Sequence, residues 1–274
     1  MGPSKTESPH TERKKPWTPK GVRLEGIDLN LLETRELTKS FGGLTAVDNV
    51  NFQVEKGELR AVIGPNGAGK TTFFNVIAGK LPPTKGEIWF KGENITHFPP
   101  YVVTKKGIGR SYQITNIFPK LTVFENMRVA AQAVEVAYNF WKDVQFLSGI
   151  NQRVMGILEK LKLIDQKDIR AANLPHGLQR HLEIGIALAS EPELLLLDEP
   201  TAGMTQEETQ RMMELIGEIS QGLTIVLVEH DMKFVMTVSK KITVLHEGKV
   251  LAEGAPEEIR NNEEVQRVYL GKRK

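Results

Sequence analysis

The sequence predicts an α/β fold with a parallel-sheet core, an antiparallel β subdomain and an α-helical subdomain. Between residues 31 and 64, apolar and polar residues alternate between glycine and asparagine turn signals, as in half-buried strands. Between residues 123 and 163, the apolar residues follow a helical pattern. From residue 193 onward, short apolar runs alternate with helical segments, which is typical of a parallel sheet covered by helices.

The composition is that of a globular protein with one large domain or two small ones. The 274 residues are 40% hydrophobic and 26% charged, and the net charge of +2 gives no electrostatic footprint for nucleic acid. Cysteine is absent, which excludes disulfides and zinc–thiolate sites and fits a reducing compartment. Residues 184–197 are too few and too polar to span a bilayer, and residues 1–30 lack the apolar core of a secretory signal. We therefore expect a cytoplasmic protein.

The chain is expected to divide into an N-terminal arm, residues 1–30, and one domain, residues 31–271. The arm is rich in Pro, Ser, Thr and charged residues, which predicts a flexible tail. Its basic run at residues 12–17 would also suit anionic lipid or a partner, but a solvated tail is the more common outcome. The helical subdomain is expected at about residues 114–190.

The remaining elements follow in chain order. Residues 71–79 predict a helix that stops at Gly79, and residues 86–95 predict a hairpin. Strand-like and helical segments then alternate over residues 193–198, 208–220, 223–231, 232–240, 241–254 and 256–270.

A glycine-rich loop carries the strongest chemical signal. The pattern G-x-x-x-x-G-K-T runs from Gly64 to Thr71, between an apolar strand and a helix. Its glycines let successive backbone N–H groups face an anion, and the helix presents its positive dipole end. Lys70 is expected to reach the β- and γ-phosphates of a nucleotide, and the Thr71 hydroxyl to bind Mg²⁺. The candidate ATP-binding residues of this loop are Gly64, Pro65, Asn66, Gly67, Ala68, Gly69, Lys70, Thr71 and Thr72.

Two apolar strands end in polar residues. Ligands of parallel sheets bind beyond the carboxyl ends of the strands, which places Asp198 at a magnesium site. Glu199 comes one residue later, where it would orient or deprotonate an attacking water. His230 ends the next strand, where a γ-phosphate contact is feasible, although a lone histidine is more often structural. Gln113 enters a loop after a strand-like segment, and by itself it is only a polar loop residue.

Taken together, these motifs resemble the ATP-binding subunits of ABC transporters over nearly the whole chain after the arm. GPNGAGKTT resembles the Walker A motif and LLLLDEP the Walker B motif. By the resemblance, Gln113 is the Q-loop glutamine, His230 the switch histidine, and Phe41 the aromatic residue that stacks on adenine. It implies a P-loop NTPase fold of the ABC ATPase type with a RecA-like core. It also implies that Mg²⁺ is held by Thr71, Gln113 and, through water, Asp198.

A closer resemblance is to the LivG-type ATPases of branched-chain amino acid importers. It rests on four segments: FGGLTAVDNV at residues 41–50, GIGRSYQITNIFPKLTVFENMRVAAQ at residues 107–132, VEHDMKFVM at residues 228–236 and GAPEEIRNNEEVQRVYLG at residues 254–271. Urea and short-amide importer ATPases are similar. Lipopolysaccharide-export ATPases share the RVYLG ending, but they usually lack FGGL and have a shorter central insert.

The family's signature motif is altered in this chain. Where the family has L-S-G-G-Q, the sequence has Leu174, Pro175, His176, Gly177 and Leu178. In the family this motif closes over the γ-phosphate of ATP held by the opposing subunit. Pro175 lacks the hydroxyl and one N–H donor, and Leu178 lacks an amide side chain, whereas Gly177 keeps the close backbone approach. Losing one charge-assisted hydrogen bond costs roughly 1.5–3 kcal/mol, enough to make that composite site slow or silent.

A second departure lies in the D-loop, which usually ends in Asp and here reads AGMT at residues 202–205. Thr205 keeps an oxygen but not the charge. The helix after the signature, expected from Gln179, keeps its dipole. Both departures lie on the surface that, by the resemblance, faces a partner ATPase.

The resemblance implies a cycle with several partners. A second ABC ATPase subunit, related or identical, docks head to tail, and Glu199 and His230 act as the catalytic residues. Closure drives two transmembrane permease subunits through a groove near Gln113, at the cytoplasmic face of the plasma membrane, and an extracytoplasmic solute-binding protein delivers the solute. No nucleic-acid partner is expected. The alternatives are a low-turnover regulatory module and a non-transport ABC ATPase in translation or DNA work, although that class often carries two ATPase domains on one chain.

Overall fold

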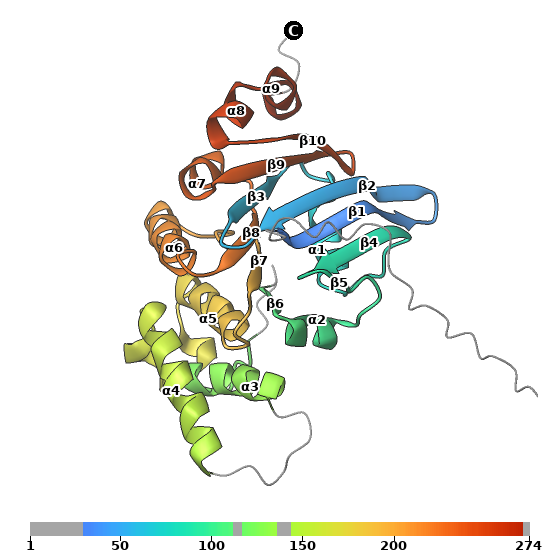
Figure 1. Ribbon diagram of the computed structural model, residues 1–274. Coiled ribbons are helices and arrows are strands. Elements are labelled where there is room, and N and C mark those ends of the chain that lie inside the picture. The colour runs from blue at the N-terminus through green and yellow to red at the C-terminus, as the bar shows by residue number, and fades with distance from the viewer. Residues whose placement is uncertain (1–29, 112–116, 136–143, 271–274) are drawn as a thin grey trace, which may run out of the picture.

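The computed structural model describes residues 30–111, 117–135 and 144–270, which form two sheets and a helical region (Figure 1). A four-stranded antiparallel sheet has the order β2-β1-β4-β5, and a six-stranded sheet has the order β10-β9-β3-β8-β7-β6. Helices α3 and α4 lie at the end of the molecule away from α8 and α9 (Figure 1). The arm, apart from Asn30, lies outside the described residues.

The strands follow the expected order along the chain. The antiparallel sheet contains β1 (Asn30–Phe41), β2 (Leu44–Glu55), β4 (Lys85–Phe90) and β5 (Glu93–Asn94). The other sheet contains β3 (Leu59–Ile63), β6 (Ile108–Arg110), β7 (Leu194–Asp198), β8 (Thr224–Val228), β9 (Lys241–His246) and β10 (Lys249–Gly254). All of its neighbouring strands pair in parallel except β9 and β10. The predicted parallel core with an antiparallel layer is confirmed.

Helices connect these strands and cover the parallel sheet. They are α1 (Lys70–Ile77), α2 (Pro100–Lys106), α3 (Val123–Glu135), α4 (Val144–Lys160), α5 (His176–Leu188), α6 (Gln206–Ile219), α7 (Met232–Val238), α8 (Pro256–Asn261) and α9 (Glu263–Leu270). The sequence patterns did not indicate α2, which begins at a proline and ends at Gly107 in the left-handed conformation. None of the helices described is long and apolar enough to cross a membrane.

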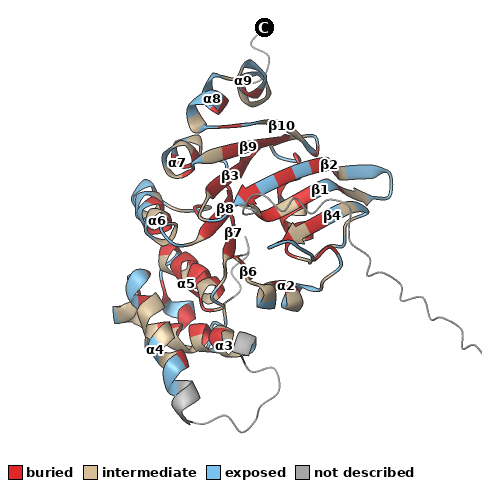
Figure 2. Ribbon diagram, in the orientation of Figure 1, coloured by how far each residue is buried: buried red, intermediate tan, exposed pale blue. Residues whose placement is uncertain are grey.

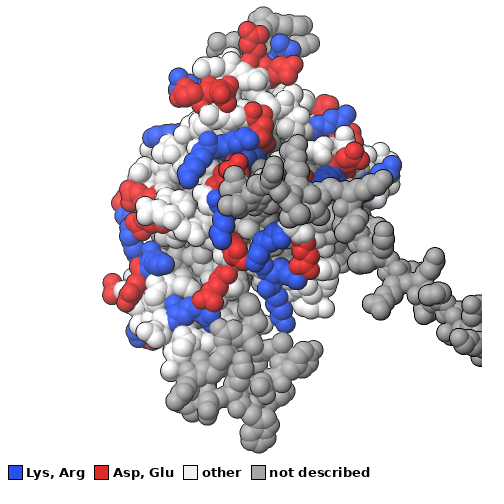
Figure 3. Space-filling view, viewed as in Figure 1, with Lys and Arg blue, Asp and Glu red and all other residues white. Residues whose placement is uncertain are grey.

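Two apolar clusters lie on opposite faces of the six-stranded sheet, which is why its central strands are buried throughout (Figure 2). One cluster joins that sheet to the antiparallel sheet through α1, where the rings of Phe52 and Phe73 meet edge to face at 5.2 Å. The other joins it to α5, α6 and α7, and continues into α3 and α4. Acidic and basic side chains are interleaved over the face seen in Figure 3.

The parallel register brings the ends of the strands to one edge. Asp198 is paired with Val228, and Val62 is paired with the same residue on its other side. The loops that follow β3, β7 and β8 therefore leave the sheet side by side. This edge carries most of the side chains expected to handle a nucleotide.

Candidate nucleotide-binding site

The loop between β3 and α1 is wedged between β2 and the β9–β10 hairpin. A Cβ atom on Gly64 would lie 2.2 Å from the carbonyl oxygen of Leu245, and one on Gly69 would lie 2.1 Å from that of Ala46. Gly69 also has φ 96°, in the left-handed region. Side chains at these two positions would clash with the backbone of β9 and β2 and displace the loop. The glycines thus fix a backbone curl that opens at the amino end of α1.

Lys70 is the first residue of α1, and its ammonium lies inside this curl. Its Nζ donates to the carbonyl oxygens of Gly64 at 2.6 Å and Pro65 at 3.0 Å. Burial lowers the pKa of Lys70, while the carboxylates of Glu199 and Asp198 act in the opposite direction. The lysine therefore lies within electrostatic range of both acids that follow β7.

Asp198 ends β7 and is 3% exposed. Its Oδ2 accepts a hydrogen bond from Arg110 Nη2 at 3.1 Å, whereas its buried Oδ1 has no hydrogen-bond partner among the described residues. Burial raises the pKa of Asp198, and Arg110 offsets this only in part. A buried carboxylate oxygen without a donor is costly, and it is also what a hard divalent cation takes as a ligand. The residues present thus fit Mg²⁺.

Glu199 and His230 occupy the loops directly after β7 and β8. Glu199 has φ 49°, an uncommon value for a residue with a Cβ, and its N–H donates to the carbonyl of Val228 at 2.9 Å. The His230 side chain is 65% exposed. The structure therefore places both predicted catalytic residues at the same edge as Lys70 and Asp198.

The other predicted metal and nucleotide residues differ in placement. Thr71 is exposed and Thr72 half-buried at the start of α1, next to Lys70. Gln113 lies outside the described residues. In the described ranges no three His, Asp or Glu side chains are grouped to hold a metal, so a cation here would need oxygens from hydroxyls, water or a ligand.

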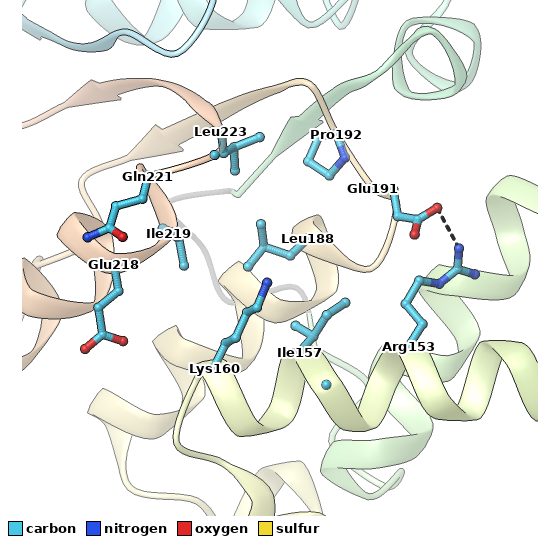
Figure 4. A pocket seen from close by; sticks show the side chains of 12 residues that line it. Arg153, Ile157, Lys160, Leu188, Glu191, Pro192, Glu218, Ile219, Gln221 and Leu223 are labelled. Atoms are coloured by element: carbon cyan, nitrogen blue, oxygen red, sulfur yellow. Dashed lines mark ion pairs between the residues drawn. The ribbon is translucent and has the colours of Figure 1, made fainter.

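A separate cavity of about 720 Å³ lies between α4, the link from α5 to β7 and the link from α6 to β8 (Figure 4). The Arg153–Glu191 ion pair, 2.7 Å long, closes one side of it. Its lining includes Leu223, just before β8 begins, so it lies at the amino ends of the strands. It is therefore distinct from the edge that carries Asp198.

Residues 47–202 match the ABC transporter family, and residues 249–274 match the family of branched-chain amino acid ATP-binding cassette transporters. The chain belongs to the ABC transporter family. This confirms the resemblance inferred from the Walker motifs and the expectation that the chain is an ATPase.

Relatives of known name agree with this assignment. The chain is 40% identical over 249 residues to the high-affinity branched-chain amino acid transport ATP-binding protein LivG of Escherichia coli K12, covering 88% of this chain and 98% of LivG. It is 30% identical over 244 residues to the lipopolysaccharide export ATP-binding protein LptB of Haemophilus influenzae, covering 89% of this chain and 98% of LptB. The fold matches an ATP-binding cassette in its ADP conformation with a TM-score of 0.78 at 28% identity, covering 89% of this chain and 99% of that one.

In the segment expected to be the signature, residues 174–178, α5 begins earlier than expected. The helix starts at His176 and not at Gln179, with the exposed Pro175 as its N-cap residue. The first N–H groups of a helix have no partner within it, so a proline there costs no helical hydrogen bond. Leu178 packs against the apolar cluster on the α5 face of the sheet, which gives the leucine a structural role. Gln179 donates to the carbonyl of Leu174, itself buried, at 3.0 Å.

The segments expected to be the signature and the D-loop, residues 174–178 and 202–205, pack together within the chain. A Cβ on Gly177 would lie 2.7 Å from Glu208 Oε1, and one on Gly203 would lie 3.4 Å from the His176 ring. Thr205 caps α6, because its hydroxyl accepts from the N–H of Glu208 while that carboxylate accepts from the N–H of Thr205. Thr205, expected to occupy the position of the D-loop aspartate, is therefore the N-cap residue of α6.

Phe41 ends β1 and is 45% exposed, and Lys39 Nζ lies 5.1 Å from the centroid of its ring. An exposed aromatic face suits stacking on a base.

Sequence reasoning missed Arg110, which donates to Asp198 Oδ2 at 3.1 Å and to Asn75 Oδ1 at 2.9 Å. Arg110 meets Asp198 because β6 pairs with β7, and no local motif signals that pairing. Tyr269 of α9 lies in the RVYLG ending that carried the resemblance, but it was assigned no role; burial raises its pKa to about 12, and the backbone of Gly64 acts against that shift.

Proposed function

We propose that this ABC ATPase binds MgATP at the carboxyl edge of its parallel sheet and drives the uptake of branched-chain amino acids through membrane permeases. The observation that carries the ATPase half is Asp198, whose buried Oδ1 lacks a partner among the described residues while Lys70 lies close by. The solute half is supported by the 40% identity to LivG, compared with 30% to LptB. Urea and short amides remain the alternative solutes.

Each residue of the edge has one task in this proposal. The backbone of residues 64–72 and Lys70 bind the phosphates, and Phe41 stacks on adenine. Thr71, Gln113 and, through water, Asp198 would hold Mg²⁺, which would neutralise charge on the phosphates. Glu199 orients and deprotonates the attacking water, and His230 contacts the γ-phosphate.

A second ABC ATPase completes the site from outside. The proposed partner contributes its signature motif over this chain's phosphates, and residues 174–178 of this chain close over the partner's. Because Pro175 and Leu178 remove a hydroxyl and an amide, that second site is the weaker one. A pair of related but different ATPases tolerates this asymmetry better than a pair of identical ones.

A groove of about 230 Å³ beside β6 suits the permease. Helices α2, α3 and α5, strand β6 and the residues just after α1 and α5 line it, mostly with small side chains: Ala78, Pro100, Thr104, Ile108, Gly109, Arg110, Ala130, Ala133, Ile186, Ala187 and Ser190. Small side chains leave room for a short helix of a partner. Docking here would hold the chain at the cytoplasmic face of the membrane, while an extracytoplasmic protein delivers the solute.

Lys70→Ala tests the ATPase half. In the full complex we expect magnesium-dependent turnover to fall by about a hundredfold and solute uptake to stop, because the phosphate charge loses its main counter-charge. Glu199→Gln is expected to keep ATP binding and lose turnover. A complex that binds ATP but releases no phosphate, with Glu199→Gln making no difference, would identify a low-turnover regulatory module. Uptake of labelled leucine compared with labelled urea decides the solute.

Ala133→Trp tests the groove. We expect the variant to hydrolyse ATP as the isolated chain does, yet to lose co-purification with the permease, because the indole fills the docking space. Ala172→Trp, at an exposed alanine outside the groove, serves as the control. Equal recovery of permease with both variants would refute docking at this groove.

A further inference from the structure

Glu229 lies between the two catalytic loops and has no task in the proposed mechanism. We propose that Glu229 is a positioning residue that ties the switch histidine, His230, to the loop that carries Glu199. The inference rests on the proposed function, because it assumes that His230 and Glu199 act on the nucleotide. It adds a coupling element within one chain that the ABC motifs do not include.

The Glu229 carboxylate joins the two loops directly. It is 0% exposed, and its Oε1 accepts from the N–H of Thr201 at 3.0 Å and from the Thr201 hydroxyl at 2.5 Å. Its Oε2 accepts from the N–H of His230 at 3.0 Å. Thr201 follows Glu199 by two residues and is 7% exposed. One buried side chain therefore holds the loop after β7 and the loop after β8 in a fixed relation.

The imidazole also lies near this carboxylate. His230 Nδ1 is 3.6 Å from Glu229 Oε2, too far for a hydrogen bond but within ion-pair range. On the other side, Asp231 caps α7 by accepting from the N–H of Phe234 at 3.1 Å. The backbone around His230 is thus anchored on both sides while its ring stays exposed.

If Glu229 served packing alone, an apolar side chain of similar size would stabilise the fold more. Burying a carboxylate completely has a large desolvation cost, which an apolar side chain avoids. The three hydrogen bonds that offset this cost come from Thr201 and His230. Both donors belong to the loops that carry the proposed catalytic residues. The arrangement therefore stabilises the relative position of those loops.

The test pairs two threonines that each donate to a carboxylate. Thr201→Val removes the hydroxyl bond to Glu229 and keeps the shape of the side chain. Thr243→Val is the matched control, because Thr243 is 0% exposed and its hydroxyl donates to Glu253 Oε2 at 3.0 Å, in β9 and away from the loops after β7 and β8. In the full complex we expect Thr201→Val to lower kcat about tenfold with the KM for ATP within twofold, the effect of one hydrogen bond to a charged group. Thr243→Val is expected to leave kcat unchanged at a similar loss of Tm.

Two further variants keep the outcome decisive. Thr201→Ser restores the hydroxyl and is expected to recover kcat, and Glu229→Gln, which sets an amide against the existing donors, is expected to lower kcat at least as far as Thr201→Val. If Thr201→Val lowers kcat no more than Thr243→Val, or if Thr201→Ser fails to recover it, the coupling role is wrong. His230→Ala and Glu199→Gln are measured alongside. If they abolish turnover while Thr201→Val does not lower it, only this inference fails; if they leave turnover intact, the proposed function fails.

Discussion

Two buried arginines pair with carboxylates at opposite ends of the parallel strands, and the two pairs differ in how fully the carboxylate is satisfied. Near the start of β3, Arg60 donates to Glu58 Oε1 and to Glu253 Oε2, both at 2.7 Å, and Thr243 also donates to Glu253. At the end of β6, Arg110 donates to one oxygen of Asp198, and the other oxygen is buried with no partner in the described part of the chain.

The pKa values of the two carboxylates, Glu253 and Asp198, shift in opposite directions. Burial acts to raise the pKa of Glu253, but Lys241, Arg60 and Thr243 outweigh it and the pKa is lowered. For Asp198 burial prevails and the pKa is raised. At Glu253, donors from β3 and β9 satisfy the carboxylate, and these bonds hold β3, β9 and β10 together. At Asp198, one buried carboxylate oxygen has no hydrogen-bond partner among the described residues, which agrees with the proposed role of this residue at a cation site.

Asp198→Asn is expected to have the largest effect of the variants that test the difference between Asp198 and Glu253. The amide still accepts from Arg110 but offers no charge to Mg²⁺, so turnover is expected to fall by about a hundredfold or more. Magnesium-dependent phosphate release by the full complex measures it. Glu253→Gln is the control and is expected to keep turnover per folded molecule. Equal losses in both variants would show that the two carboxylates do not differ in function.

Arg60→Met tests whether the contacts of Arg60 with Glu58 and Glu253 stabilise the fold. It removes the partner of Glu58 and Glu253 and fills part of the volume, so the free energy of unfolding is expected to drop by about 2 kcal/mol. The full cost of breaking a buried pair is not reached, because Glu253 still contacts solvent and keeps Lys241. Denaturant unfolding measures the loss, and turnover per folded molecule is expected to stay unchanged. A variant as stable as the parent chain would contradict the assigned role of the arginine.

The sequence predicted those parts of the site that lie close together in the chain. The glycine loop and Lys70 are one segment, and the apolar run before Asp198 marks a buried strand that ends at the ligand edge. The capping box of Thr205 could also have been predicted, because T-x-x-E is a local signal. Thr205 was considered only as a departure from the D-loop aspartate.

Contacts between distant segments could not be predicted. Arg110 and Asp198 are 88 positions apart, and they meet because β6 pairs with β7. Likewise, Glu229 meets Thr201 because β7 and β8 are neighbours. Strand order is a property of the assembled sheet, so no local spacing encodes which arginine reaches which acid. Such partners complete the chemistry of a motif, and they appear only in the fold.

The pH dependence of stability gives the smallest expected effect, with opposite signs at the two ends of the strands. The folded-state pKa of Glu253 is lowered, so its ionised form contributes stability at neutral pH that is lost as pH falls through that pKa. The folded-state pKa of Asp198 is raised, so its ionisation costs stability as pH rises through that pKa. Without nucleotide or Mg²⁺, Glu253→Gln is therefore expected to be less stable than the parent chain at pH 7 and Asp198→Asn more stable. Both differences should shrink on acidification toward pH 4, as measured by denaturant unfolding at each pH. Differences of the same sign would mean that the two pairs are electrostatically alike, and the contrast between them would fail.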